Sequence, residues 1–261
     1  MVQQRLGYSE RLACRAIGQS RSSQRYRAWV APQDSSLIRR MEEIKQQNPR
    51  WGYRRVAAVM RSEGWSVSDK RLYRIYRSDG CHVEQPIRKR KAAKKPVKKV
   101  AASRENEVWA CDTTTDHDER GRPLVWLAAI DEFSRHCRVL SVHRNVQGST
   151  LVNEFDMAFR SHALPSRLRC DNNRLWHSSI WRKWLAKSST SIRFIERGCP
   201  WQNGHIESFF GRLRNELLQS TEFTTLNDAR TQAAIWLSYY NSERPHGSLG
   251  MVPPDTFVHE Q

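Results

Sequence analysis

The alternation of hydrophobic and polar positions divides the chain into a helical first part and a later part that mixes strands with helices. In the first part, apolar residues recur at the spacing of one helix face, as at Leu37, Met41 and Ile44. The later part contains short apolar runs such as residues 124–131, which are typical of buried strands. We therefore expect a mixed α/β sheet with helices on its faces, preceded by an all-α region.

The same patterns give approximate bounds for the elements of the later part. Strands are expected at residues 108–115, 124–131, 137–143, 167–170 and 191–195. Helices are expected at residues 149–162, 180–186, 203–218 and 226–240. Three adjacent strands followed by strands that alternate with helices indicate one mixed sheet.

Residues 50–78 of the helical part predict a helix-turn-helix. Gly64 follows a first amphipathic pattern, and Ser68 precedes a second one as a plausible N-cap. The second helix carries basic residues that suit the major groove of DNA, namely Lys70, Arg71, Arg74 and Arg77. A helical hairpin with a solvated basic face is the alternative interpretation.

The charge of the chain favours a polyanionic partner. Lys and Arg number 44 against 27 Asp and Glu, so the net charge is +17. Basic side chains that neutralise phosphates release condensed counterions, which favours nucleic acid as the partner. A merely basic surface or an anionic membrane remains the alternative, and composition does not distinguish DNA from RNA.

Positive charge is concentrated in a segment that marks a domain boundary. Residues 86–100 read PIRKRKAAKKPVKKV, in which like charges repel and two prolines prevent one continuous helix. We expect a helical DNA-binding region at 1–85, a basic linker at 86–104 and a catalytic domain at 105–261. Lys94 and Lys95 are candidate phosphate contacts, and a solvated tether is the alternative.

Several classes of protein do not fit the sequence. No stretch approaches the roughly 20 apolar residues that cross a bilayer, so an intracellular protein is expected. None of the six cysteines forms a C-x-x-C pair, which argues against a structural zinc site or a disulfide framework. The chain also lacks the glycine-rich loops that bind ATP or dinucleotides.

Three acidic residues are candidates for chemistry on phosphodiesters. Asp112 lies within the first expected strand, Asp171 directly follows a short strand, and Glu207 lies on an expected helix. Carboxylates suit hard divalent cations such as Mg²⁺, and two such ions can assist phosphodiester displacement. Surface acids or helix caps are the alternative, and Asp116 and Glu196 are further acids offset from these positions.

Longer motifs give the chain a family resemblance. They are RWGYRRVAAVMRSEGW, WACDTTTD, LAAIDEFSR, LRCDNN, ERGCPWQNGHIESFFGRLRNELL and YYNSERPHGSLG. Over about residues 108–254 the chain resembles the DDE transposases of bacterial insertion sequences. The resemblance is to the group related to retroviral integrases, and within it to the downstream product of two overlapping reading frames.

The resemblance implies a ribonuclease-H-like fold with a five-stranded mixed sheet. It implies that Asp112, Asp171 and Glu207 bind Mg²⁺ or Mn²⁺, two ions in all, and catalyse cleavage and strand transfer at element ends. Arg214 matches a basic residue of the family, and its offset of seven from Glu207 places both on one helix face. Asp131 matches an acid that the family does not use as a ligand.

The resemblance also implies partners, and the chain departs from the family at one position beside Asp171. The implied partners are double-stranded DNA of the terminal repeats and of the target, further copies of the chain in a homo-oligomer on DNA, and an upstream-frame product. The resemblance also implies a cytoplasmic, nucleoid-associated location in a bacterium. The family commonly has Gly where this chain has Asn173; a left-handed backbone there would suit Gly best and Asn next. The alternative functions are an inactive DNA-binding remnant or regulator of the element, and a nuclease acting on RNA–DNA hybrids.

Overall fold

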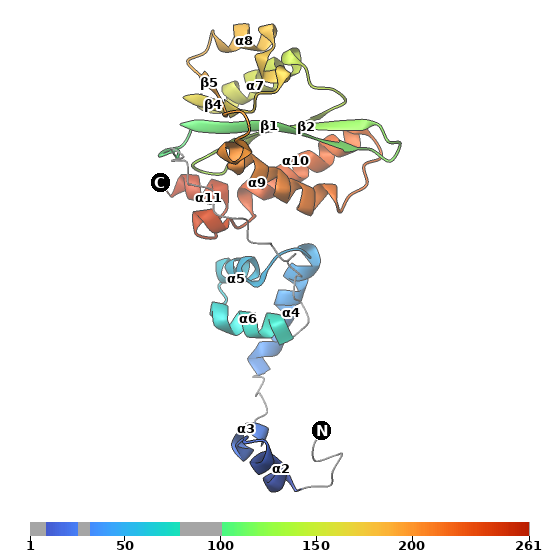
Figure 1. Ribbon diagram of the computed structural model, residues 1–261, viewed down its shortest axis with the longest axis vertical. Coiled ribbons are helices and arrows are strands. Elements are labelled where there is room, and N and C mark those ends of the chain that lie inside the picture. Colours follow the sequence, from blue (N-terminus) through green and yellow to red (C-terminus); the bar gives the residue numbers. More distant parts are fainter. Residues whose placement is uncertain (1–8, 26–31, 79–100, 261) are drawn as a thin grey trace. The chain divides into compact units, whose positions relative to one another are not determined.

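The structure, a computed structural model, describes residues 9–25, 32–78 and 101–260 (Figure 1). Lys94 and Lys95, two of the expected phosphate contacts, lie outside these residues. The chain divides into two compact units, Met1–Ile44 and Lys45–Gln261, and the helix α4 (Pro32–Gln47) runs across the boundary. In the part of the chain that the structure describes, no helix has the length and apolar character needed to span a membrane.

The first unit is helical, as the sequence predicts. It contains α2 (Glu10–Ala16) and α3 (Arg21–Arg25), and most of α4. The side-chain oxygen of Ser9 accepts a hydrogen bond from the Leu12 amide and caps α2. On α4, the predicted apolar stripe of Leu37, Met41 and Ile44 is buried.

The second unit begins with the helix pair α5 (Tyr53–Ser62) and α6 (Asp69–Ser78), which confirms the two helices predicted at residues 50–78. The first helix starts three residues later than predicted. Gly64 has a φ of +89°, a left-handed conformation that ends α5 without the cost of a Cβ. The Ser68 hydroxyl accepts a hydrogen bond from the Arg71 amide at 3.2 Å, which is the predicted N-cap of α6.

A five-stranded mixed sheet in the order β3-β2-β1-β4-β5 organises the rest of the second unit. Its strands are β1 (Val108–His117), β2 (Pro123–Asp131), β3 (Cys137–His143), β4 (Arg167–Cys170) and β5 (Ser191–Phe194). The first three strands form an antiparallel meander, and β4 and β5 run parallel to β1. The predicted mixed sheet of five strands is confirmed, and β1 lies at its centre.

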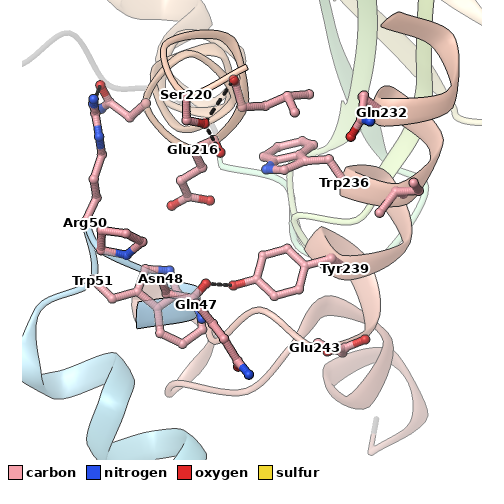
Figure 2. A pocket seen from close by; sticks show the side chains of 14 residues that line it. Gln47, Asn48, Arg50, Trp51, Glu216, Ser220, Gln232, Trp236, Tyr239 and Glu243 are labelled. Atoms are coloured by element: carbon pink, nitrogen blue, oxygen red, sulfur yellow. Dashed lines mark hydrogen bonds between the residues drawn. The ribbon is translucent and has the colours of Figure 1, made fainter. Parts of the chain in front are cut away.

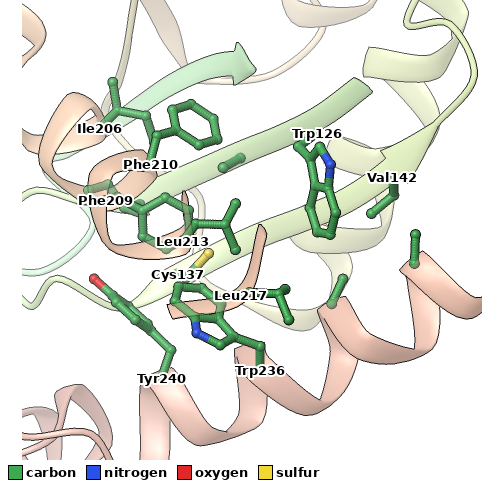
Figure 3. Close-up of a cluster of buried hydrophobic side chains, with 14 of the residues drawn as sticks. Trp126, Cys137, Val142, Ile206, Phe209, Phe210, Leu213, Leu217, Trp236 and Tyr240 are labelled. Carbon is green, nitrogen blue, oxygen red and sulfur yellow. The ribbon is translucent and has the colours of Figure 1, made fainter. Parts of the chain in front are cut away.

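Helices cover both faces of this sheet (Figure 1). One face carries α7 (Gly148–Ser161) and α8 (Ser179–Leu185), and the other carries α9 (Gly204–Leu213) and α10 (Leu226–Ser242). Two hydrophobic cores result, because the period-two alternation of the strands sends apolar side chains to both faces. Figure 3 shows the core on the α9–α10 face, in which Trp126 of β2 lies near Leu213, Leu217 and Trp236.

The helix expected at residues 203–218 is composite. A 3-10 turn, Pro200–Asn203, leads into α9, and a π-helical turn, Arg214–Leu218, follows it. The amide of Gln219 donates to the carbonyl of Arg214 at 2.9 Å, which is the spacing of a π-helix. Short turns at Arg174–His177 and Gly247–Leu249 and the helix α11 (Pro254–His259) were not predicted.

Candidate functional site

The first candidate acid, Asp112, lies in the central strand of the sheet. It is paired across β1 and β2 with Ala128. Strand residues alternate between faces, so Asp112 shares its face with Ala110, which belongs to the core under α9 and α10. Its Oδ1 accepts a hydrogen bond from the Thr113 amide at 2.7 Å, and the side chain is half-buried. The strand therefore presents this carboxylate toward the α9 side.

The second candidate acid, Asp171, directly follows β4, the parallel neighbour of β1. Its Oδ1 accepts a hydrogen bond from the Asn173 amide at 3.2 Å, and the Asn173 side chain in turn accepts one from the Leu175 amide at 3.3 Å. Asn173 has φ −68° and ψ 145°. This is ordinary extended backbone, so the left-handed conformation considered for this position is not adopted, and replacement of Gly by Asn imposes no backbone strain here.

The third candidate acid, Glu207, is exposed in the first turn of α9, and α9 packs against β1 and β2. The start of this helix is tied to the central strand by Asn203. The Asn203 Nδ2 donates to the carbonyl oxygen of Cys111 at 3.3 Å, one residue before Asp112, and the side chain is buried. A buried amide that bonds to the strand next to Asp112 fixes where α9 begins.

The charges of Asp171 and Glu207 act on the carboxyl group of Asp112. Burial, together with the negative charges of Asp171 and Glu207, raises the pKa of Asp112 from 3.8 to about 6, although the Thr113 hydrogen bond opposes this. Among the described residues, however, no three Asp, Glu, His or Cys side chains are gathered as a ready metal-binding group. The acids are thus near enough to repel one another but are not arranged as a complete ligand set.

This donor set has the chemistry of a hard-cation site. It consists of carboxylates, the ligands that Mg²⁺ and Mn²⁺ prefer. A cation among them would offset the repulsion that raises the pKa of Asp112. The residues therefore fit a divalent cation by charge and ligand type.

Arg214 directly follows α9 and contacts the central strand β1. Its Nη2 donates to the Thr114 hydroxyl at 3.1 Å, and Thr114 shares the face of β1 with Asp112. Arg214 is exposed and opens the π-helical turn. Glu207 and Arg214 are both exposed.

Other acids have structural roles or lie apart. The Asp131 carboxylate is fully buried and accepts hydrogen bonds from the amides of Asn106, Phe133 and Ser134, so it closes the turn after β2. This agrees with its assignment as a structural acid. Glu196 is exposed in the loop before α9.

The basic residues expected to bind DNA in the helix pair lie on α6. Lys70, Arg74 and Arg77 are exposed, and Arg71 is half-buried. The inward face of α6 is formed by Leu72 and Tyr76, which are buried, as the amphipathic pattern predicts. Three of the four predicted contacts are thus open to a partner.

A cavity of about 550 Å³ lies away from the candidate acids (Figure 2). It is lined by residues 47–51 and by side chains of the π-helical turn and α10, with Trp236 and Tyr239 among them. Figure 2 shows the Tyr239 hydroxyl donating to the Asn48 side chain across it. None of the candidate acids lines this cavity, and we assign it no role in the site.

The turn after α10 has a structural role. Arg244 is fully buried, and its guanidinium donates to both carboxylate oxygens of Glu216 at 2.7 and 2.6 Å. Burial and the neighbouring Arg244 charge lower the pKa of His246 to about 2, so this imidazole is neutral at pH 7. The ion pair joins the turn to the π-helical segment that follows α9.

Family models match three stretches of the chain. Two models described as "Integrase core domain" match residues 102–200 and 188–254, and one described as "HTH-like domain" matches residues 32–91. The integrase-core matches cover the sheet and its helices, including all three candidate acids. The HTH-like match covers α5 and α6.

Curated relatives come from bacterial insertion elements. A protein of insertion element IS407 from Burkholderia multivorans is 33% identical, over 98% of this chain and 93% of its own length. A protein of IS476 from Xanthomonas euvesicatoria is 36% identical, over 96% of this chain and 72% of its own length. The transposase InsD of IS2D from Escherichia coli is 24% identical, over 87% of this chain and 80% of its own length.

Solved structures agree on the fold. A chain of the simian T-cell lymphotropic virus intasome superposes with a TM-score of 0.54 at 13% identity, over 84% of this chain and 74% of that chain. The core therefore has the integrase, ribonuclease-H-like fold. With both domain models and insertion-element relatives in agreement, the chain belongs to the insertion-sequence transposases that join a helix-turn-helix-like domain to an integrase core.

Proposed function

We propose that this transposase cleaves DNA at the ends of an insertion sequence and joins the freed strand to target DNA. The observation that supports this most directly is the perturbed carboxyl group of Asp112, on which the charges of Asp171 and Glu207 act. The pKa of Asp112 is raised to about 6, first by burial and then by the charges of Asp171 and Glu207. Such a perturbed carboxylate group in an integrase core is typical of a functional site.

Asp112, Asp171 and Glu207 would hold the divalent cation, Mg²⁺ or Mn²⁺, and we propose two ions. When bound, such ions activate the attacking oxygen and stabilise the leaving oxygen of a phosphodiester. The carboxylates come from the central strand, from the end of its parallel neighbour and from α9. Ions bound there would draw Asp112 and Glu207 together, because the cation charge replaces their repulsion.

Two sets of basic residues would bind the DNA. Arg214 is exposed on the helix that carries Glu207, and its guanidinium suits a phosphate beside the reacting strand. On α6, the exposed Lys70, Arg74 and Arg77 suit the major groove and its flanking phosphates. The HTH-like family model over residues 32–91 supports this division of binding from cutting.

The assembly on DNA is also part of the proposal. Element ends come in pairs, and joining them to a target requires that two ends be held together. We propose a homo-oligomer of this chain on the terminal repeats, with the upstream-frame product as a further partner. The resemblance to two-frame insertion-sequence transposases supports this.

Replacing Asp171 with Asn tests the cutting function. The substitution keeps the side-chain size but removes a metal-binding charge. We expect Asp171→Asn to abolish Mg²⁺-dependent cleavage of end-containing DNA while DNA binding is retained. Glu196→Gln, in the exposed loop before α9, is the matched control and should cleave like the wild type.

The outcome separates the two functions that remain. Equal cleavage by Asp171→Asn and wild type would reject the assignment of this acid. No cleavage by the wild type on the repeats of its own element, with binding retained, would favour a DNA-binding regulator or remnant. That alternative draws on the same helix pair, and the lack of a gathered ligand group among the described residues is the observation in its favour.

A further inference from the structure

A buried ion pair lies on the same face of the sheet as the candidate acids. Glu132, in the turn after β2, has a fully buried side chain, and the side chain of Arg169 in β4 is 11% exposed. The Arg169 Nη1 donates to both carboxylate oxygens of Glu132, at 2.7 and 3.0 Å. Leu168 and Cys170 face the core under α7 and α8. Arg169 therefore faces the α9 side, as does Asp171 two residues later.

The backbones of both partners are fixed by the sheet. The Glu132 amide donates to the carbonyl oxygen of Val108 in β1 at 2.9 Å. Arg169 is paired with Ala110 of β1 and with Arg193 of β5. Neither side chain is a flexible surface group, since both are buried and both backbones are hydrogen-bonded to strands of the sheet. The ion pair is thus held between the start of β1 and β4.

The same arginine reaches the loop that leads into α9. Its Nη1 also donates to the carbonyl oxygen of Gln202 at 3.2 Å. The Gln202 side chain accepts a hydrogen bond from the Glu196 amide at 2.9 Å, which closes the loop on itself. Glu207 follows Gln202 by five residues. One guanidinium therefore connects β4, the strand that directly precedes Asp171, to the segment that leads to Glu207.

The turn after β2 contacts α9 at a second point. Arg135, whose φ of +61° is unusual for a residue with a side chain, places its guanidinium on the Nδ1 of His205. His205 lies in the first turn of α9, two residues before Glu207. Arg169 of β4 contacts the start of the helix at Gln202, and the turn after β2 contacts it at His205. Together these two contacts define the position and the direction of the start of the helix.

From this geometry we propose that Glu132 and Arg169 are positioning residues. They set the separation of Asp171 and Glu207, and through it the affinity for divalent cations, although neither touches the reacting atoms. The proposal rests on the proposed function in that the acids bind metal. Glu132 supplies the charge that allows Arg169 to be buried, and Arg169 supplies the contact to Gln202. Groups that orient metal ligands in this way typically change metal affinity by roughly 10–100-fold when they are altered.

The test compares two conservative substitutions in the same strand. Arg169→Lys keeps the charge beside Glu132 but shortens the side chain, so that its reach to Gln202 is lost. Arg167→Lys is the matched control, because Arg167 precedes Arg169 by two residues on the same face and pairs with Glu107 at 3.2 Å. Mn²⁺ affinity is measured on the full chain without DNA, by the electron paramagnetic resonance of free Mn²⁺.

We expect Arg169→Lys to bind Mn²⁺ roughly tenfold more weakly than the wild type, a change of the size seen for residues that orient metal ligands. Arg167→Lys should match the wild type. Hydrogen exchange of the backbone amides at residues 202–207 should accelerate in Arg169→Lys alone. If Arg169→Lys does not unfold cooperatively, Glu132→Gln takes its place, because it retains the volume and one acceptor oxygen.

Wild-type Mn²⁺ affinity in folded Arg169→Lys, or in folded Glu132→Gln where it takes the place of Arg169→Lys, would overturn the proposal. If the wild type itself binds no Mn²⁺, the proposed function fails instead, and hydrogen exchange still decides the positioning role. In that case, unchanged exchange at residues 202–207 would overturn it, and faster exchange would support it.

Discussion

Asp112 combines two conditions that oppose ionisation of its carboxyl group. Its side chain is half-buried in the central strand, and two further carboxylates lie near enough to repel its charge. Both conditions favour the protonated form, which explains a pKa of about 6. Carboxyl groups with a strongly shifted pKa are concentrated at functional sites. The neighbouring acids suggest that the function of Asp112 is to bind a cation.

This shift has a consequence for stability. The folded-state pKa of Asp112, about 6, lies above its ordinary value of 3.8, so the folded chain holds this proton more tightly than the unfolded chain. The free energy of unfolding of the metal-free protein should fall as pH rises from about 4 through 6. Asp112→Asn has no carboxyl group to ionise at this position, so its free energy of unfolding should not fall in this way. At pH 7 it should exceed that of the wild type by about 2 kcal/mol after allowance for solvent screening.

Thermal or urea unfolding at pH 4, 5, 6 and 7 in the presence of a chelator checks the prediction. The advantage of Asp112→Asn should be absent near pH 4 and complete above pH 6. Asp116→Asn, on the same face of β1, controls for the removal of a carboxylate from that face. A difference between Asp112→Asn and wild type that does not vary with pH would contradict the assigned shift.

At the scale of elements, α6 presents a row of exposed basic side chains above a buried apolar face. We expect Arg74→Ala to weaken binding to element ends and to reduce the salt dependence of binding by about one unit of log–log slope, because one phosphate contact is lost. Arg160→Ala, an exposed arginine of α7 paired with Asp156, is the control and should leave the slope unchanged. Binding isotherms at several salt concentrations provide the slopes.

An unchanged slope and affinity in Arg74→Ala would place end recognition outside α6. Arg71 is a weaker choice for this test, because it is half-buried and its amide takes part in the cap of the helix. Its substitution would mix a loss of DNA contact with a loss of packing.

Elements with a strong local signal could be predicted from the sequence. Apolar runs gave the strands of the sheet, and Gly64 and Ser68 gave the turn between α5 and α6, since glycine and N-cap preferences act within a few residues. The composite nature of the helix that carries Glu207 could not be predicted. Its flanking turns depend on contacts distant in sequence, from Asn203 to Cys111 and from Glu216 to Arg244.

The candidate site also has parts that could be predicted from the sequence and parts that could not. The three acids were predicted as ligands because their motifs and spacing match those of the family. The Glu132–Arg169 pair was missed, since 37 residues separate the partners and each looks like an ordinary charge. The available signal was the second arginine of the short strand RLRC at residues 167–170, which lies between the apolar Leu168 and Cys170. The conformation considered for Asn173 was not adopted, because the side chains of Asp171 and Asn173 close the turn without a left-handed residue.

At the scale of the whole molecule, the net charge of +17 suits a protein that binds DNA over an extended surface. In the proposed function, the helix pair binds DNA and the integrase core cuts it. Substitutions in α6 should therefore reduce binding and cleavage together. Substitutions of the three acids should reduce cleavage alone.

Strand cleavage by two variants of the central strand tests the account most directly. Asp112→Asn and Asp116→Asn each remove one carboxylate from the same face of β1, four residues apart. Nicking of end-containing duplex and joining of its 3′ end to a target plasmid are measured in Mg²⁺ and in Mn²⁺. The account predicts that Asp112→Asn loses both activities while Asp116→Asn retains them. Nicking and joining by Asp112→Asn at the wild-type rate would contradict it.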